Sequence, residues 1–160
     1  QLAMGDAIAV CLLECREFTS TDFARFHPGG ALGKRLYLKV SDISKQNALP
    51  AVDIESSIKS LIIEISSKRL GAAAVLDKGE LVGVITDGDV RRMLEKTDNL
   101  SEIKAKDIMN ARPKVIDGGE LAIAALQLMQ TNNISQILVT DNGKYAGIVH
   151  LHDLIKEGII

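Results

Sequence analysis

Two apolar stripes with helical spacing dominate the pattern of hydrophobic and polar positions along the chain. Their members are Ile58, Leu61, Ile62 and Ile65 in the first stripe and Leu121, Ala125, Leu128 and Met129 in the second. Side chains three and four residues apart share one face of a helix. Each stripe therefore predicts a helix with one buried face.

Two short β-rich runs follow each predicted helix. Residues 72–76 and 81–86 flank Lys78-Gly79, and residues 137–140 and 145–149 flank Asn142-Gly143. An X-Gly dipeptide suits the two-residue turn of a β-hairpin. Since a short helical pattern follows each hairpin, the order from Val40 onward is predicted as strand, helix, strand, tight turn, strand and helix, present twice.

The two predicted units are copies of one sequence pattern. The stretch Gly83-Val84-Ile85-Thr86-Asp87-Gly88-Asp89 returns as Gly147-Ile148-Val149-His150-Leu151-His152-Asp153, 64 positions later. Asp42-Ile43 recurs as Asp107-Ile108, 65 positions later, so one insertion lies before Val52 or its partner Ile116. Units this small bury little core alone, and we expect them to pack on each other with a cleft between equivalent surfaces.

Composition and charge exclude several classes of partner. The chain has 160 residues, of which 46% are hydrophobic and 25% charged, and its net charge is −2. A balance of this kind offers no basic surface for nucleic acid, and 3% aromatic residues leaves little for base stacking. Neither an apolar run of ~20 residues nor a signal peptide is present. We therefore expect a cytoplasmic protein without a membrane or nucleic-acid partner.

An apolar arm precedes the repeat. Residues 1–18 have a helical pattern that begins without a capping residue, which predicts a fragment of a longer protein whose first domain is missing. An apolar helix of this kind predicts self-association, as a homodimer. Cys11 and Cys15 share one helix face, and we expect buried thiols there, neither a disulfide nor a metal site.

The repeat resembles a tandem pair of cystathionine-β-synthase (CBS) domains. The resemblance rests on the strand-helix-strand-strand-helix order, on the motif G-h-h-T-x-x-D at residues 83–89 and on the openings at residues 40–43 and 105–109. It implies an α/β fold of the α+β type, with CBS domains at residues 40–99 and 100–160.

Residues 4–9 and the stretch 22–33, which contains Phe26-His27-Pro28-Gly29-Gly30, resemble the junction between the sugar-isomerase (SIS) domain and the CBS pair of bacterial D-arabinose-5-phosphate isomerases. That family interconverts ribulose 5-phosphate and arabinose 5-phosphate, the precursor of the lipopolysaccharide sugar Kdo. The resemblance implies that residues 1–39 are the end of a truncated SIS domain with a linker, and that the parent is a tetramer. It also implies that the isomerase activity belongs to the parent and not to this fragment alone.

Thr86 and Asp89 are the first candidate site. At a helix start, free N–H groups favour phosphate; the threonine hydroxyl could bind that phosphate and the aspartate a ribose, as family members do at matching positions. The competing interpretation is a capping box, in which Thr86 and Asp89 only stabilise the helix start. In the second copy His150 replaces the threonine before Asp153, so the two half-sites need not be equivalent.

Histidines supply the remaining candidates. The resemblance implies that His27 reaches the active site of the parent isomerase, where an imidazole suits proton transfer. His150 and His152 alternate at a strand end, but with no third ligand nearby in sequence we predict no metal site. No cofactor is required. The leading hypothesis is a regulatory pair that binds CMP-Kdo, CMP or an adenine nucleotide, and the alternative is a structural oligomerisation module without a physiological ligand.

Overall fold

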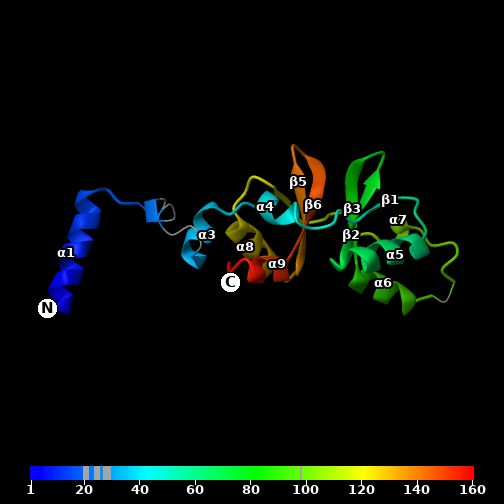
Figure 1. Cartoon of the computed structure of the whole chain (residues 1–160). Coiled ribbons are helices and arrows are strands. Elements are labelled where there is room, and N and C mark those ends of the chain that lie inside the picture. Colours follow the sequence, from blue (N-terminus) through cyan, green and yellow to red (C-terminus); the bar gives the residue numbers. More distant parts are fainter. Residues whose placement is uncertain (20–21, 24–25, 27–29, 98) are drawn as a thin grey trace.

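The computed structural model describes residues 1–19, 22–23, 26, 30–97 and 99–160, and each repeated unit contains the predicted strand-helix-strand-strand-helix order (Figure 1). The prediction that a unit opens with a strand at Val40 is wrong, because a short helix precedes the first strand of each copy. The arm contains α1 (Leu2–Cys15) and α3 (Ala31–Tyr37). The first copy contains α4 (Val40–Ser44), β1 (Ala51–Asp53), α5 (Ile58–Lys68), β2 (Ala72–Asp77), β3 (Glu80–Thr86) and α6 (Asp87–Leu94). The second contains α7 (Ala105–Ile108), β4 (Val115–Asp117), α8 (Ala122–Asn132), β5 (Gln136–Asp141), β6 (Lys144–His150) and α9 (Leu151–Lys156).

Each copy has one three-stranded sheet, in the order β1-β2-β3 or β4-β5-β6. The first strand pairs parallel with the second, and the second pairs antiparallel with the third. The hairpin turns are the predicted ones: φ is 52° and 88° at Lys78 and Gly79, and 50° and 78° at Asn142 and Gly143. Two consecutive positive φ values are what a tight turn compatible with the strand twist requires.

The opening helix of each copy packs on the other copy. Val40 and Ile43 of α4 belong to the buried core of the second copy, and Ala105 of α7 belongs to that of the first. Backbone hydrogen bonds fix both helices: the Val40 N–H donates to the Glu120 carbonyl oxygen, and the Ala105 N–H donates to the Ser56 carbonyl oxygen, each at 2.9 Å. Consequently neither core is complete without residues of the other copy.

A third buried cluster lies between the two sheets. Its members are Leu70, Ala72 and Ala74 of the first copy and Leu138 and Ile148 of the second. The equivalent strands β3 and β6 contact each other, which confirms the prediction that the copies pack on each other within one chain. The short alanine side chains of β2 let the second sheet approach closely.

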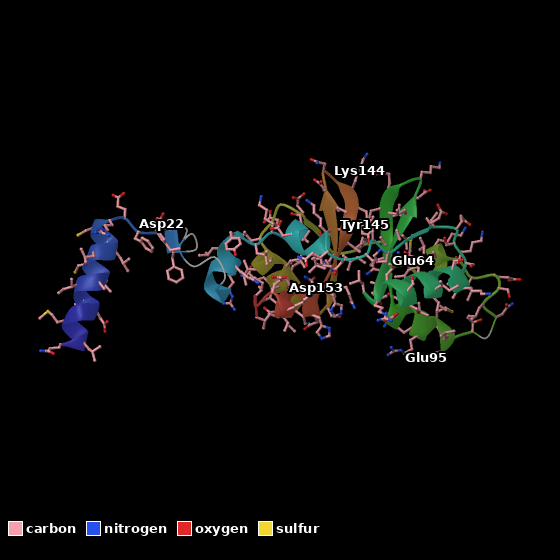
Figure 2. All side chains as sticks on the ribbon, viewed as in Figure 1. Asp22, Glu64, Glu95, Lys144, Tyr145 and Asp153 are labelled. Carbon is pink, nitrogen blue, oxygen red and sulfur yellow. The ribbon has the colours of Figure 1, made fainter. Side chains whose placement is uncertain are left out.

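Tyr145 adds a polar contact to this junction, and Figure 2 shows it beside Glu64 of the other copy. Its hydroxyl donates to the Pro50 carbonyl oxygen at 2.9 Å. Burial, and secondarily the Glu64 carboxylate, raises the pKa of Tyr145. The hydroxyl therefore keeps its proton and remains a hydrogen-bond donor.

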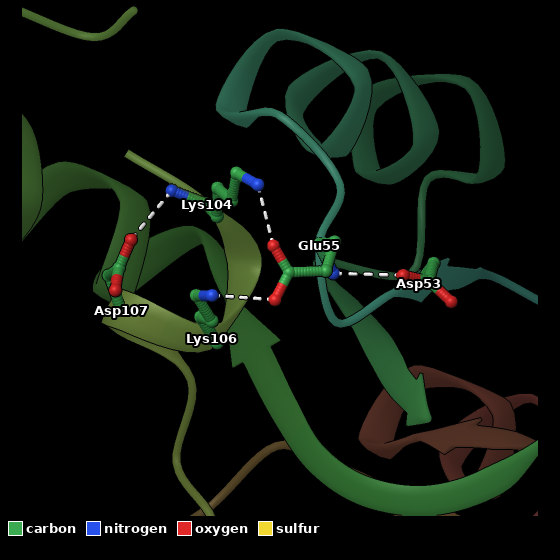
Figure 3. A network of polar contacts seen from close by, with 5 residues as sticks. All are labelled: Asp53, Glu55, Lys104, Lys106 and Asp107. Carbon is green, nitrogen blue, oxygen red and sulfur yellow. Dashed lines mark hydrogen bonds and ion pairs between the residues drawn. The ribbon is translucent and has the colours of Figure 1, made fainter. Parts of the chain in front are cut away.

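Glu55 joins the β1–α5 loop to the start of the second copy (Figure 3). One carboxylate oxygen pairs with Lys104 Nζ at 2.6 Å and the other with Lys106 Nζ at 2.5 Å. The hydrogen bonds from Lys104 and then Lys106 lower the pKa of Glu55 from 4.5 to about 2. The carboxylate is therefore a charged link between the copies.

Glu55 should make stability depend on pH in the acid range. A carboxyl whose folded pKa lies below its unfolded pKa stabilises the fold above the unfolded value, and this contribution is lost as the pH falls through the folded value. For Glu55 the window runs from 4.5 down to about 2. We expect Glu55→Gln to flatten the stability curve in that window, measured by urea unfolding at low salt. Glu80→Gln, an exposed change outside the network, is the control, and equal slopes for both variants would contradict the expectation.

The arm is the least packed part of the described chain. Every residue of α1 is exposed, and in Figure 1 the helix stands apart from both copies. The prediction of buried thiols is therefore wrong, because Cys11 and Cys15 are exposed and free. By contrast, α3 is docked on the end of the second copy, where Lys34 pairs with Glu157 at 2.8 Å and Arg35 donates to the Ile159 carbonyl oxygen at 2.9 Å.

Candidate functional site

A cleft of about 230 Å³ between the copies brings the motif of the first copy against polar residues of the second. Its polar lining consists of Thr86, Asp89 and Arg92 from the first copy and Asn110, Lys114 and Gln136 from the second. We call it the Thr86 cleft. Residues from α6, from the segment before β4 and from the start of β5 meet only because the two copies are docked.

Backbone pairing holds the two walls of the Thr86 cleft together. The Asn110 N–H donates to the Val84 carbonyl oxygen at 2.9 Å, and the Val84 N–H donates to the Asn110 carbonyl oxygen at 3.1 Å. A Cβ atom at Gly83 would lie 2.8 Å from Met109 Sδ and 3.1 Å from the Asn110 oxygen. The glycine that opens the motif therefore allows the second copy to approach β3.

Thr86 and Asp89 form a reciprocal cap at the start of α6. Asp89 Oδ2 accepts hydrogen bonds from the Thr86 N–H at 2.9 Å and from Thr86 Oγ1 at 2.6 Å. In return Thr86 Oγ1 accepts from the Asp89 N–H at 3.3 Å. This is a capping box, which both interpretations of the motif allow. The pair stabilises α6 before any ligand binds.

The charges in the Thr86 cleft are of both signs. Arg92 Nη2 pairs with Asp89 Oδ1 at 2.6 Å. Burial alone would raise the pKa of Asp89, but the hydrogen bonds from Thr86 and Arg92 outweigh it and hold this pKa below 3.8. Lys114 is exposed and has no ion pair with any described residue. An ionised carboxylate beside two cations suits a ligand with both hydroxyl groups and an anionic group.

The equivalent aspartate of the second copy has different neighbours. Asp153 Oδ2 accepts from the His150 N–H at 2.8 Å and from Asn47 Nδ2 of the first copy at 2.7 Å. One space beside Asp153 is about 100 Å³ and is lined by Gln46, Asn47 and Lys156 among others. We call it the Asp153 cleft.

His150 takes the place of the threonine, and its ring faces its own helix. Its Nδ1 accepts from the His152 N–H at 3.0 Å, and the two rings are stacked with centroids 4.9 Å apart. Burial first, and then the neighbouring His152, lowers the pKa of His150, which Asp153 only partly opposes. This shift favours the neutral imidazole, which makes His150 a poor source of positive charge for a phosphate there.

A larger opening of about 430 Å³ is lined by His150 and Asp153 of the second motif and by Asp87 of the first, with Arg69 and Gln136 among its other lining residues. Gln136 also lines the Thr86 cleft. The two spaces therefore share one wall.

Comparison with known families identifies the repeated unit. The model of the CBS domain matches residues 40–96 and 105–159, one match for each copy. The chain belongs to the CBS-domain family. In solved structures, the CBS-domain protein NE2398 matches with a TM-score of 0.69 at 21% identity, covering 76% of this chain and 98% of that one. CBS-domain protein PAE2072 from Pyrobaculum aerophilum, solved in complex with AMP, matches with a TM-score of 0.66 at 21% identity, covering 73% and 90%. At these identities the likeness concerns the fold alone.

The sequence relatives are isomerases. Arabinose 5-phosphate isomerase KdsD from Salmonella typhi is 39% identical over 161 residues, which are 99% of this chain and 49% of the relative. The chain therefore spans about half the length of the curated relatives it matches, and the matched region includes the arm as well as the CBS pair. This similarity agrees with the resemblance found from the junction residues.

The CBS copies place the predicted site residues in two clefts. Thr86 and Asp89 line the first. His150 and Asp153 lie together at the start of α9 and both line the 430 Å³ opening, and Asp153 also lines the smaller cleft. Sequence reasoning missed Arg92, Lys114 and Gln136. Arg92 could have been found, because it lies three residues after Asp89 on a predicted helix. Lys114 and Gln136 become neighbours of Thr86 only when the CBS copies dock.

The structure says little about the remaining candidates, which are His27, a metal site and a membrane-spanning helix. His27 lies outside the residues that the structure describes. Within the described ranges, no three His, Cys, Asp or Glu side chains are grouped so that they could hold a metal ion. In the same ranges, no helix has the length and apolar character needed to cross a membrane.

Proposed function

We propose that this CBS pair is the regulatory ligand-binding module of an arabinose-5-phosphate isomerase, and that it takes a nucleotide or nucleotide sugar in the Thr86 cleft. One observation carries the proposal: docking of the copies gathers a carboxylate, a hydroxyl and two cations around one cleft. The parent enzyme would interconvert ribulose 5-phosphate and arabinose 5-phosphate for Kdo and lipopolysaccharide synthesis in the cytoplasm. Its SIS domain, with His27 near the active site, would be the partner that receives the signal.

Ligand binding would be an exchange of hydrogen bonds. The Thr86 hydroxyl now donates to Asp89 at 2.6 Å, and Arg92 pairs with the same carboxylate. Two ribose hydroxyls could donate to Asp89 in their place. Thr86 and the exposed Arg92 would then be free to bind phosphate together with Lys114. Such an exchange leaves no charged group of the cleft without a partner.

Two kinds of nucleotide fit this chemistry. The AMP complex of the Pyrobaculum aerophilum protein and the AMP complex of CBSX2 favour an adenine nucleotide. The relation to KdsD favours CMP-Kdo or CMP, because feedback requires that a pathway product bind away from the active site. All of these ligands present a ribose diol and phosphate to the protein.

The structural alternative is supported by the completed capping box, which satisfies Asp89 without a ligand. The exposed apolar residues of α1 also support this alternative, among them Leu2, which is 86% exposed, and Met4, which is 68% exposed.

We expect the chain to self-associate through this surface, as a dimer of CBS pairs. Sedimentation at high micromolar concentration should give a dimer, and Leu2→Glu with Met4→Glu should shift it toward monomer. A monomer for the unchanged chain would contradict this expectation.

Calorimetric titration of the purified chain with CMP-Kdo, CMP, AMP and ATP tests the regulatory proposal. A saturable heat for at least one nucleotide is expected, and inorganic phosphate and free ribose should compete only weakly. If none of the four binds at millimolar concentration, the structural alternative stands.

A further inference from the structure

A second space adjoins the Thr86 cleft and lies between α6 and α7. Its volume is about 280 Å³, and its lining includes Asp89, Arg92, Met93 and Lys96 of the first copy and Asp107 and Ile108 of the second. We call it the α6–α7 groove. The spacing of the first-copy residues places them on one face of α6 and of the turn that ends it, where the Lys96 N–H donates to the Met93 carbonyl oxygen at 3.0 Å.

The Thr86 cleft and the α6–α7 groove are neighbours along both of their walls. On the α6 wall, Asp89 and Arg92 line both spaces. On the wall of the second copy, the chain runs from Ile108 in the groove to Asn110 in the cleft. The ion pair of 2.6 Å between Arg92 and Asp89 therefore stands where the two spaces meet.

Arg92 is the exposed partner of this ion pair. Its side chain is 64% exposed, whereas that of Asp89 is 19% exposed. In the exchange proposed above, ribose hydroxyls replace Arg92 on the Asp89 carboxylate, and the guanidinium turns to the phosphate. The room beyond Arg92 then receives the group that the phosphate carries.

The polar lining of the α6–α7 groove offers both a cation and an acceptor. Lys96 is exposed and has no ion pair with any described residue. Asp107 Oδ2 accepts from the Lys104 N–H at 2.8 Å, and Oδ1 accepts no hydrogen bond from the part of the chain that the structure describes. Sugar hydroxyls can donate to such a carboxylate, and an acid group can pair with the lysine. A bare phosphate chain would instead meet Asp107 as a like charge.

The apolar lining of the groove suits a sugar as well. Met93 is buried, with 6% of its surface exposed, and Ile108 is half-buried. Both belong to or pack against the core of the first copy. They offer a fixed apolar surface to the C–H groups of a sugar ring, which a chain of phosphates lacks.

We propose that the α6–α7 groove holds the sugar of a nucleotide sugar, and that this sugar carries a carboxylate, which Lys96 binds. The inference rests on the proposed function, because the nucleotide part of the same ligand occupies the Thr86 cleft. Of the two kinds of ligand that fit the cleft, the groove selects the nucleotide sugar.

Calorimetry with AMP, CMP, CDP and CMP-Kdo tests this assignment. CMP and AMP report on the Thr86 cleft alone, CDP adds a bare phosphate, and CMP-Kdo adds a sugar with a carboxylate. Each is titrated into the unchanged chain, Lys96→Ala and Asp107→Ala, with thermal melting to establish that the variants are folded. Lys59→Ala is the control for charge, because it removes an exposed lysine of α5. Asp42→Ala is the control for the helix cap, because Asp42 accepts from the Lys39 N–H at the start of α4 as Asp107 does at α7.

The unchanged chain should bind CMP-Kdo about tenfold more tightly than CMP or better, the effect of one added hydrogen bond between charged groups. Lys96→Ala and Asp107→Ala should each remove most of this gain and leave the affinity for CMP unchanged, and neither control should alter the gain. If CMP or AMP binds but CMP-Kdo gains nothing, or if CDP gains as much as CMP-Kdo, the groove assignment is refuted while the Thr86 cleft stands. A gain that both Lys96→Ala and Asp107→Ala retain would refute it too. If none of the nucleotides binds, both proposals fail.

Discussion

Replacing Asp89 with alanine should weaken nucleotide binding by about 10- to 150-fold, since hydrogen bonds to a charged group contribute roughly 1.5–3 kcal/mol. It should also lower the free energy of unfolding by about 0.5–2 kcal/mol, the range for a lost helix cap. The second effect follows from the capping box, in which Asp89 accepts from the Thr86 N–H and hydroxyl. Calorimetry and urea unfolding of the same preparations measure the two effects separately.

Asp153→Ala is the internal control for this prediction. Asp153 holds the equivalent position and also caps its helix, but His150 stands where the first copy has Thr86. We therefore expect a comparable loss of stability and little loss of affinity. Lost stability with unchanged affinity in Asp89→Ala would show that Thr86 and Asp89 only cap α6. An equal loss of affinity in Asp153→Ala would show that the two half-sites are ranked wrongly.

Replacing Ile148 with alanine should lower the free energy of unfolding by about 2–5 kcal/mol, the range for emptying a buried aliphatic site. Ile148 is fully buried in the cluster that both sheets share. Because α4 and α7 complete each other's cores, both copies should unfold in one transition that moves to lower urea. Far-ultraviolet circular dichroism follows both copies, whereas tyrosine fluorescence comes from Tyr37 and Tyr145 and follows the second copy with α3. The two signals should change at the same urea concentration.

Ile63→Ala is the control for Ile148, because Ile63 lies on α5 and is 58% exposed. It should cost less than about 1 kcal/mol, as expected for a side chain that stays largely in water. Two resolved transitions, of which Ile148→Ala moves only one, would contradict the interlocked arrangement of the copies.

Local patterns were enough to predict the strands and the later two helices of each copy, but not the short opening helices α4 and α7. The apolar stripe around Leu61 depends only on residues close in sequence, and so does the Lys78-Gly79 turn. Because each pattern occurs again in the second copy, each prediction is supported twice. The docking of the copies was predicted in outline, because neither unit could bury a core alone. Its register could not be predicted, since it depends on contacts between residues as distant as Val84 and Asn110.

The candidate site was predicted only in part for the same reason. Thr86 and Asp89 are three residues apart in the sequence, and this spacing is sufficient to predict both a cap and a binding role. Lys114 of the second copy lines the Thr86 cleft, and Asn47 of the first copy lines the Asp153 cleft. Both contacts cross the junction between the copies, so sequence spacing cannot predict them. The apolar residues of α1 likewise predicted that this helix is buried. The sequence did not indicate a surface for it to pack on, and Cys11 is exposed.

The most direct test of the Thr86 cleft is the amide spectrum of the isotope-labelled chain during titration with AMP and, separately, with CMP. If the account is correct, saturable shifts will appear at residues 86–89, at residues 110–112 and at Gln136, from both walls of one cleft. The amides of His150 and Asp153 should move much less, because His150 replaces the threonine of the motif there. Shifts confined to the Asp153 cleft, or no saturable shift with either nucleotide at millimolar concentration, would contradict it.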